Sequence, residues 1–263
     1  AQLGLFGSQV RPRSAGDLLM ASLADMIGAS RAGPVQRSVQ GYGGQCTFPF
    51  TQCRPPISSF ISRDESTAIG VCDSISAHWI KYHAEGSSLW NWLIVNGEIS
   101  MTKLLYGVMQ LQSQGILSDD QDATTEAWLR QEGIVPVKRN TKGLESERTR
   151  IGFRQFQGAF LRGVQRGQTR MHNAKTVARA ILDDPTGGAG LYKKLSLEGK
   201  FGAHTMALWV AQDVAFFDAN FGEFWFESRA GFFNWFTKKF WSSSLYNIGL
   251  SGNYEVYPYA KRV

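Results

Sequence analysis

The stretch GAHTMALWVAQDVAFFDANFGEF, residues 202–224, contains two short apolar runs separated by a polar turn. Runs of this length and composition, bounded by turn-forming residues, predict two neighbouring strands of an antiparallel sheet. The first strand contains His204 among apolar residues, and the second ends at Asp218. A polar side chain in a central strand needs a bonding partner, so the alignment of the two strands becomes the first question.

The length of the loop between the strands decides whether His204 and Asp218 meet. With a three-residue loop, Met206 pairs with Asp218, and His204 lies two positions away on the same face, about 7 Å between backbones. With a two-residue loop the two side chains face opposite ways, because side chains alternate along a strand. The sequence does not decide between the two registers. It also allows that Asp218 only forms a turn and that His204 is a core residue bonded to another neighbour.

A second stretch, AIGVCDSISAHWIKYH at residues 68–83, has apolar residues at helical spacing after Gly70. The pattern places Cys72 at the start of a buried helix, where unpaired N–H groups and the helix dipole favour a thiolate. The alternative is an inert buried cysteine, which is a common state of this residue type. A reactive cysteine needs a base, and His78 and His83 lie about 9 Å and 16 Å along the helix axis, too far to serve.

His204 is left as the candidate base, since His172 lies in a basic segment near a helix start, where we expect a surface or capping role. Cys72 on a helix start, followed late in the chain by His204 and Asp218 on adjacent strands, has the order and layout of a papain-type triad.

The remaining sequence divides into a helical part and a terminal sheet. Residues 39–56 contain too much Gly and Pro for regular structure. Helical spacing predicts helices, and short apolar runs predict extended segments. The expected helices are at 17–30, 100–117, 122–134, 172–184 and 228–241, and the expected extended segments are at 135–137, 191–197 and 254–259.

These elements predict an α+β fold, and the order and layout of Cys72, His204 and Asp218 make the expected fold papain-like. In it, a helical N-terminal part with Cys72 at the start of a buried helix packs on a C-terminal antiparallel sheet that carries His204 and Asp218. We expect residues 1–60 to be a loosely ordered lead-in with one helix, and residues 61–263 to form the catalytic domain.

The charge is concentrated in one segment. The chain has a net charge of +6, but residues 138–179 alone hold eleven Lys and Arg against two Glu, so the remainder is slightly acidic. Such a segment suits an anionic membrane surface, and a solvated face is the alternative. A nucleic-acid partner is not expected. Cys46, Cys53 and Cys72 form neither a disulfide framework nor a metal-binding spacing, and we expect no cofactor and no metal.

The pieces GVCDSISAHW, GAHTMAL and FFDANFGEF resemble the YopT/AvrPphB group of bacterial effector cysteine proteases, which are papain-like. In that group the nucleophile opens a helix with a Trp seven positions on, here Cys72 and Trp79. The histidine lies in a Gly-His-Ala-like strand, and the acid begins an Asp-Pro-Asn-x-Gly-Glu-Phe-like turn, here residues 218–224. The resemblance implies that Cys72 is the nucleophile, His204 the base and Asp218 the acid that orients it.

The resemblance also implies a biological role. It implies a thiol protease that a bacterium secretes into a target cell, that acts in that cell's cytoplasm on a protein substrate, and that is able to cleave itself. An inhibitory or immunity protein is a candidate partner. Papain-like enzymes usually place an Asn or Gln five or six residues before the cysteine as an oxyanion donor. Here Thr67 and Ser66 occupy these positions, so their hydroxyls are candidate donors beside the Cys72 N–H.

Two other readings remain open from the sequence. The same Cys-His-Asp site supports deamidation, transglutamination or acyl transfer, because all of these reactions use a thioester. The protein could instead be a non-catalytic binding module that uses its basic segment.

Overall fold

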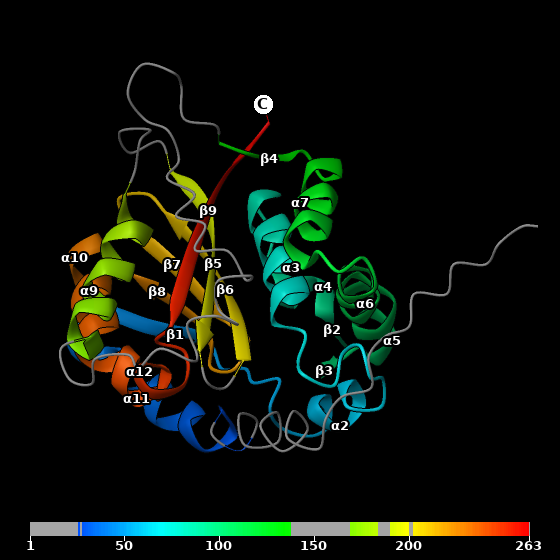
Figure 1. The fold of residues 1–263 in the computed structure, drawn as a ribbon, viewed down its shortest axis with the longest axis horizontal. Helices are drawn as coiled ribbons and strands as arrows, with labels where there is room; N and C mark the ends of the chain where they lie inside the picture. The colour runs from blue at the N-terminus through cyan, green and yellow to red at the C-terminus, as the bar shows by residue number, and fades with distance from the viewer. Residues whose placement is uncertain (1–25, 27, 138–168, 184–189, 200–201, 263) are drawn as a thin grey trace, which may run out of the picture.

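The computed structural model describes residues 26, 28–137, 169–183, 190–199 and 202–262 of the chain. An antiparallel sheet of seven strands lies between two groups of helices (Figure 1). The expected α+β fold, with a helical N-terminal part and a C-terminal antiparallel sheet, is therefore confirmed.

Helices dominate the first half of the described chain. The helix expected over 100–117 is present as two α-helical segments joined by a π-helical turn, η2. The helix expected over 122–134 begins behind Asp120, whose side chain accepts from the Ala123 N–H, and is followed by Gly133 at a positive φ of 74°. The elements of this half are η1 (Gln40–Tyr42), β1 (Gly44–Phe48), α2 (Ile57–Ile61), α3 (Cys72–Ala84), α4 (Leu89–Leu93), β2 (Ile94–Val95), β3 (Glu98–Ile99), α5 (Met101–Lys103), η2 (Leu104–Met109), α6 (Gln110–Leu117), α7 (Gln121–Gln131) and β4 (Ile134–Pro136).

The second half provides most of the sheet. The strand order is β1-β8-β7-β6-β5-β9-β4, which makes β6 the central strand, as the apolar surroundings of His204 predict. The elements are α9 (Thr169–Leu182), β5 (Leu191–Gly199), β6 (Gly202–Val210), β7 (Val214–Asp218), β8 (Gly222–Phe226), α10 (Arg229–Trp235), the π-helical turn η3 (Phe236–Phe240), α11 (Trp241–Ser243), α12 (Tyr246–Gly249) and β9 (Asn253–Lys261).

The register of β6 and β7 is the one that a three-residue loop gives. Val210 pairs with Val214, and Met206 pairs with Asp218. His204 therefore lies on the same face of the sheet as Asp218, two positions away along β6. The two-residue alternative, which would put the side chains on opposite faces, is excluded by this pairing.

Two cores cover the two faces of the sheet. On one face Met206, Phe216 and their neighbours pack against α9 and α10. On the other face Ala207 and Phe217 pack against α3, whose Trp79 is 1% exposed. Burial on both faces explains why β6 and β7 read as continuous apolar runs rather than as an alternating pattern.

Two strands of the seven-stranded sheet, β1 and β8, were not expected from the sequence, and neither was the short β2–β3 pair. The prediction of irregular structure over residues 39–56 is wrong for Gly44–Phe48, which forms β1 and pairs with β8. The β8 strand follows Asp218 so closely that Asp218 itself pairs with Gly222. Both strands depend on partners that no local pattern shows, and a register shift interrupts β1 between Cys46 and Phe48.

Some predictions lie partly outside the described residues. Of the helix expected over residues 17–30, the structure describes only the end, and residues 28–37 are helical. Of the basic segment 138–179, it describes only the part within α9.

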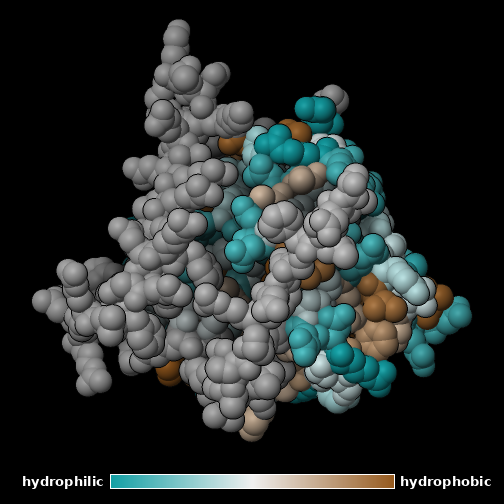
Figure 2. All heavy atoms as spheres, turned by 45° about the vertical axis from the view of Figure 1, so that its right-hand side comes forward, coloured by the Kyte–Doolittle hydropathy of each residue, from teal (hydrophilic) through white to brown (hydrophobic). Residues whose placement is uncertain are grey.

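The surface over the helical layer carries both hydrophilic and hydrophobic side chains (Figure 2). Large apolar side chains on this layer that are exposed include Val95, Leu105, Tyr106 and Leu117. In the part of the chain that the structure describes, no helix is both long enough and apolar enough to cross a membrane.

His78 gives the helical layer a sensitivity to acid. It is 4% exposed, its ring lies against Trp92 and Trp128, and its Nδ1 is 2.8 Å from the Ser74 carbonyl oxygen. Burial lowers the pKa of His78 to about 4, against the opposing effect of the Ser74 carbonyl. Between pH 6.5 and pH 4 the unfolded chain therefore binds a proton that the folded chain does not.

We predict that the free energy of unfolding falls as the pH drops through this window, with His78 contributing up to about 3 kcal/mol of the loss. Urea unfolding of wild type and of His78→Gln, each at pH 7 and at pH 4.5, measures the loss in the free energy of unfolding. The variant should lose less stability between the two pH values than wild type. Equal losses in both proteins would contradict the assignment.

Candidate active site

Cys72 begins α3, as the sequence predicts. Gly70, at a positive φ of 116°, turns the chain into the helix, and the Ser74 hydroxyl closes the first turn on the Val71 carbonyl at 3.1 Å. Most of the α3 residues that follow are buried, but Cys72 is partly exposed. The thiol therefore combines a helix N-terminus, which favours an anion, with access for a substrate.

His204 lies between Asp218 and Cys72. Its Nε2 is 2.9 Å from Asp218 Oδ1, and the side chain of His204 is 6% exposed. Because a carboxylate only accepts hydrogen bonds, Nε2 carries a proton and the other ring nitrogen, Nδ1, is left for Cys72. Cys72 is within hydrogen-bonding and charge range of the imidazole. The three residues that the sequence nominates are thus brought together.

The surroundings of His204 favour its charged form. Burial alone would lower its pKa, but the Asp218 carboxylate and the Cys72 sulfur outweigh this effect and raise the pKa of His204 to about 10. A charged imidazole beside the sulfur is one half of the thiolate–imidazolium ion pair that an activated cysteine nucleophile uses.

Asp218 is held by three donors. It is fully buried, and its carboxylate accepts from His204 Nε2, from the Asn220 N–H at 2.8 Å and from the Tyr246 hydroxyl at 3.0 Å. Burial and the nearby carboxylate raise the pKa of Tyr246 well above its usual value, so this hydroxyl keeps its proton. The acid therefore has a fixed orientation toward His204. Sequence reasoning assigned no role to Asn220 or Tyr246.

The other two cysteines are not suited to be the nucleophile. All three cysteines of the chain are free thiols. Burial raises the pKa of Cys46 to about 11, with a further contribution from Glu223 and an opposing one from the Phe48 backbone. Cys53 is buried, and its Sγ lies 3.1 Å from Asn220 Oδ1.

His78 and His83 are bonded to groups other than the thiol. His78 bonds to the Ser74 carbonyl, and His83 Nδ1 lies 2.9 Å from the Tyr192 hydroxyl. His172 falls within α9, and its side chain lies outside the described residues. Among the described residues, no group of three or more His, Cys, Asp or Glu is arranged to hold a metal ion.

The candidate oxyanion donors Ser66 and Thr67 are engaged elsewhere. The Thr67 hydroxyl is buried and donates to the Ile61 carbonyl oxygen at 2.7 Å. The Ser66 hydroxyl donates to Asp64 Oδ1 at 2.5 Å. Either hydroxyl would have to leave its present acceptor to donate to an oxyanion, so this role stays a prediction.

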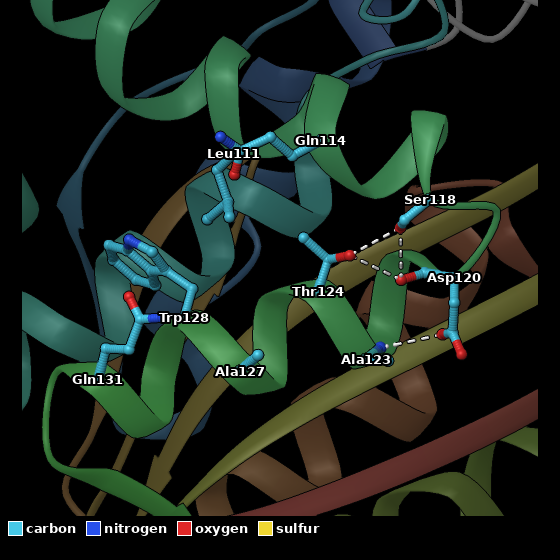
Figure 3. Close-up of a pocket in the computed structure, with 9 residues that line it drawn as sticks. All are labelled: Leu111, Gln114, Ser118, Asp120, Ala123, Thr124, Ala127, Trp128 and Gln131. Atoms are coloured by element: carbon cyan, nitrogen blue, oxygen red, sulfur yellow. Dashed lines mark hydrogen bonds between the residues drawn. The ribbon is translucent and has the colours of Figure 1, made fainter. Parts of the chain in front are cut away.

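A pocket of about 380 Å³ lies between α6 and α7 (Figure 3). At one end of the pocket polar groups bond to each other: the Ser118 and Thr124 hydroxyls are 2.8 Å apart, and Asp120 accepts from the Ala123 N–H. None of the three candidate catalytic residues lines it. The candidate site at the start of α3 is therefore separate from this pocket.

Comparison with known proteins gives a family match and close relatives. The family Peptidase_C58, described as Yersinia/Haemophilus virulence surface antigen, matches residues 36–259. The cysteine protease yopT1 of Yersinia enterocolitica is 35% identical over 252 residues, which cover 92% of this chain and 72% of the relative. The cysteine protease YopT of Yersinia pestis is 35% identical over 239 residues, 89% of this chain and 69% of the relative. The crystal structure of the Pseudomonas avirulence protein AvrPphB matches with a TM-score of 0.46 at 16% identity, covering 75% of this chain and 95% of that one.

We predict that Asp218→Asn weakens the ion pair. Without the carboxylate the pKa of His204 falls, the imidazole loses its charge at a lower pH, and the thiolate beside it is less favoured. The rate of Cys72 alkylation by iodoacetamide at pH 6 should fall about tenfold, the effect of roughly one pKa unit. A thermal unfolding curve controls for loss of structure. An unchanged rate in a folded variant would contradict the role of Asp218.

Proposed function

The chain belongs to the Peptidase_C58 family and is a cysteine protease of the bacterial effector type, and on this premise we propose that Cys72, His204 and Asp218 are its catalytic residues. The observation that carries the proposal is the placement of His204, with Nε2 on Asp218 at 2.9 Å and Cys72 in range of the imidazole. These positions supply the nucleophile, the proton carrier and the orienting acid that the reaction needs.

In the proposed mechanism the Cys72 thiolate attacks the carbonyl carbon of a peptide bond. The Cys72 backbone N–H, at the N-terminus of α3, donates to the oxyanion that forms. His204 gives its proton to the leaving amine, and a thioester to Cys72 remains. His204, now neutral, takes a proton from water as the water attacks the thioester, and collapse of this second tetrahedral intermediate releases the acid product and restores the Cys72 thiolate beside a charged His204.

Asp218 acts through His204. Its fixed carboxylate keeps the imidazole ring oriented and stabilises the positive charge that His204 carries before it protonates the leaving amine and after it takes a proton from water. The burial of both side chains strengthens this interaction, because water does not screen it.

The substrate is a protein, as the peptidase family implies. We further propose that the enzyme is secreted by a bacterium, enters a target cell, cleaves its substrate in the cytoplasm of that cell and also processes itself. The named Yersinia relatives and the virulence description of the family support this setting. The inhibitory or immunity protein, the membrane surface contacted by residues 138–179 and the division of the chain at residue 60 stay predictions.

The proposal predicts that cleavage depends on Cys72 alone among the three cysteines. Wild type, Cys72→Ala and the matched control Cys46→Ala are expressed in a candidate target cell, and new protein N-termini are labelled and identified by mass spectrometry. Wild type and Cys46→Ala should generate the same new termini, and Cys72→Ala should generate none of them.

Two outcomes would count against proteolysis by this residue. Identical termini from wild type and Cys72→Ala would exclude Cys72 as the nucleophile. Cys72-dependent deamidation or amine adducts without new termini would show that the thioester serves another reaction.

A further inference from the structure

Gln52 is a buried polar side chain that the mechanism above does not use. It lies between β1 and α2, twenty residues before the nucleophile, and is 5% exposed. A buried side-chain amide must bond to something, since an unsatisfied one costs free energy comparable to a lost hydrogen bond. Both ends of this amide bond to segments that carry catalytic residues.

One end of the amide holds the chain just before Cys72. Gln52 Oε1 accepts from the Val71 N–H at 3.0 Å, and this hydrogen bond is buried. Gly70 makes the approach feasible, because a Cβ at this position would lie only 3.3 Å from Gln52 Nε2. The bond fixes the residue that precedes the nucleophile, at the point where α3 begins.

The other end holds the turn that follows Asp218. Gln52 Nε2 donates to Asn220 Oδ1 at 2.9 Å, and the Gln52 backbone N–H donates to the Ala219 carbonyl at 2.7 Å. The Asn220 N–H in turn donates to Asp218 at 2.8 Å. The amide therefore connects the entry to the nucleophile with the turn that orients the acid.

We propose that Gln52 is a positioning residue that sets the start of α3 against the His204–Asp218 pair, an inference that rests on the proposed catalytic triad. Gln52 belongs to neither of the segments that carry the proposed catalytic residues, yet its side chain bonds to both segments. One bond ends at Val71, next to Cys72, and the other at Asn220, two positions after Asp218.

The test measures the reactivity of Cys72, which needs no knowledge of the substrate. Gln52→Met removes both side-chain hydrogen bonds and keeps a similar length. Gln36→Met is the matched control, because Gln36 Nε2 donates at 2.9 Å to the carbonyl of Phe221 in the same turn but has no bond to the Val71 segment. The rate of alkylation of Cys72 by iodoacetamide is followed from pH 5 to pH 9 by peptide mapping, and thermal unfolding is recorded for each protein.

We expect Gln52→Met to slow alkylation at pH 6 about tenfold or more and to move its pH profile upward, because a small displacement of the thiol weakens the ion pair. Gln36→Met should keep the wild-type profile, whatever its thermal stability. If Gln52→Met is folded and keeps the wild-type rate and profile, Gln52 has a structural role only and the proposal is overturned.

Two further variants are measured in the same way, one in case Gln52→Met does not fold and one to test the triad separately. Asn220→Ala breaks the far end of the bridge and leaves the bond to Val71, so it replaces Gln52→Met if that variant does not fold. A wild-type profile in folded Asn220→Ala then overturns the proposal. His204→Ala separates this proposal from the triad: an unchanged Cys72 rate there refutes the triad itself. A rate that depends on His204 but not on Gln52 refutes only the positioning role.

Discussion

The hydrogen bond between His204 Nε2 and Asp218 Oδ1 depends on one register, and the site depends on that bond. Because Met206 pairs with Asp218, the side chains of His204 and Asp218 lie on one face of the sheet. The two strands that carry them, β6 and β7, are buried on both faces. A shift by one residue would separate them and turn the apolar side chains of β6 to the wrong core. The packing of both cores thus also holds the catalytic pair in place.

Cys72, the proposed nucleophile, lies near this pair because α3 is attached to the sheet by buried polar contacts. The Ser76 hydroxyl donates to the carbonyl of Thr205, the neighbour of His204, at 3.2 Å. Lys194 on β5 is fully buried and lies 2.9 Å from Asp73, the residue after Cys72. Burial opposes the charge of Lys194, but Asp73 and other neighbours outweigh it and raise the lysine's pKa, so the ion pair persists. Such pairs add little net stability but define how two elements fit together.

Much of this arrangement follows from sequence, because its signals are local. The helix after Cys72 and the acid at the end of a strand are each encoded within a short stretch, whereas the sequence allows either a two- or a three-residue loop between β6 and β7. The pairing of β1 with β8 and the bonds of Gln52 are not encoded locally, because their partners lie far along the chain: about 170 residues separate Gln52 from Asn220. Tyr246 gives no local signal either, since only the fold brings its hydroxyl to Asp218.

The proposed site requires a charged His204 between Asp218 and the Cys72 sulfur, and NMR titration of the His204 imidazole tests this requirement most directly. In ¹⁵N-histidine-labelled wild type, the ring signals of His204, assigned by their loss in His204→Gln, should stay those of an imidazolium through pH 8, in line with a pKa of about 10. In Cys72→Ala, where the sulfur no longer favours the charge, the same signals should titrate at a lower pH. A wild-type His204 that titrates near the ordinary value of about 6.5, with no change in Cys72→Ala, would contradict the ion pair.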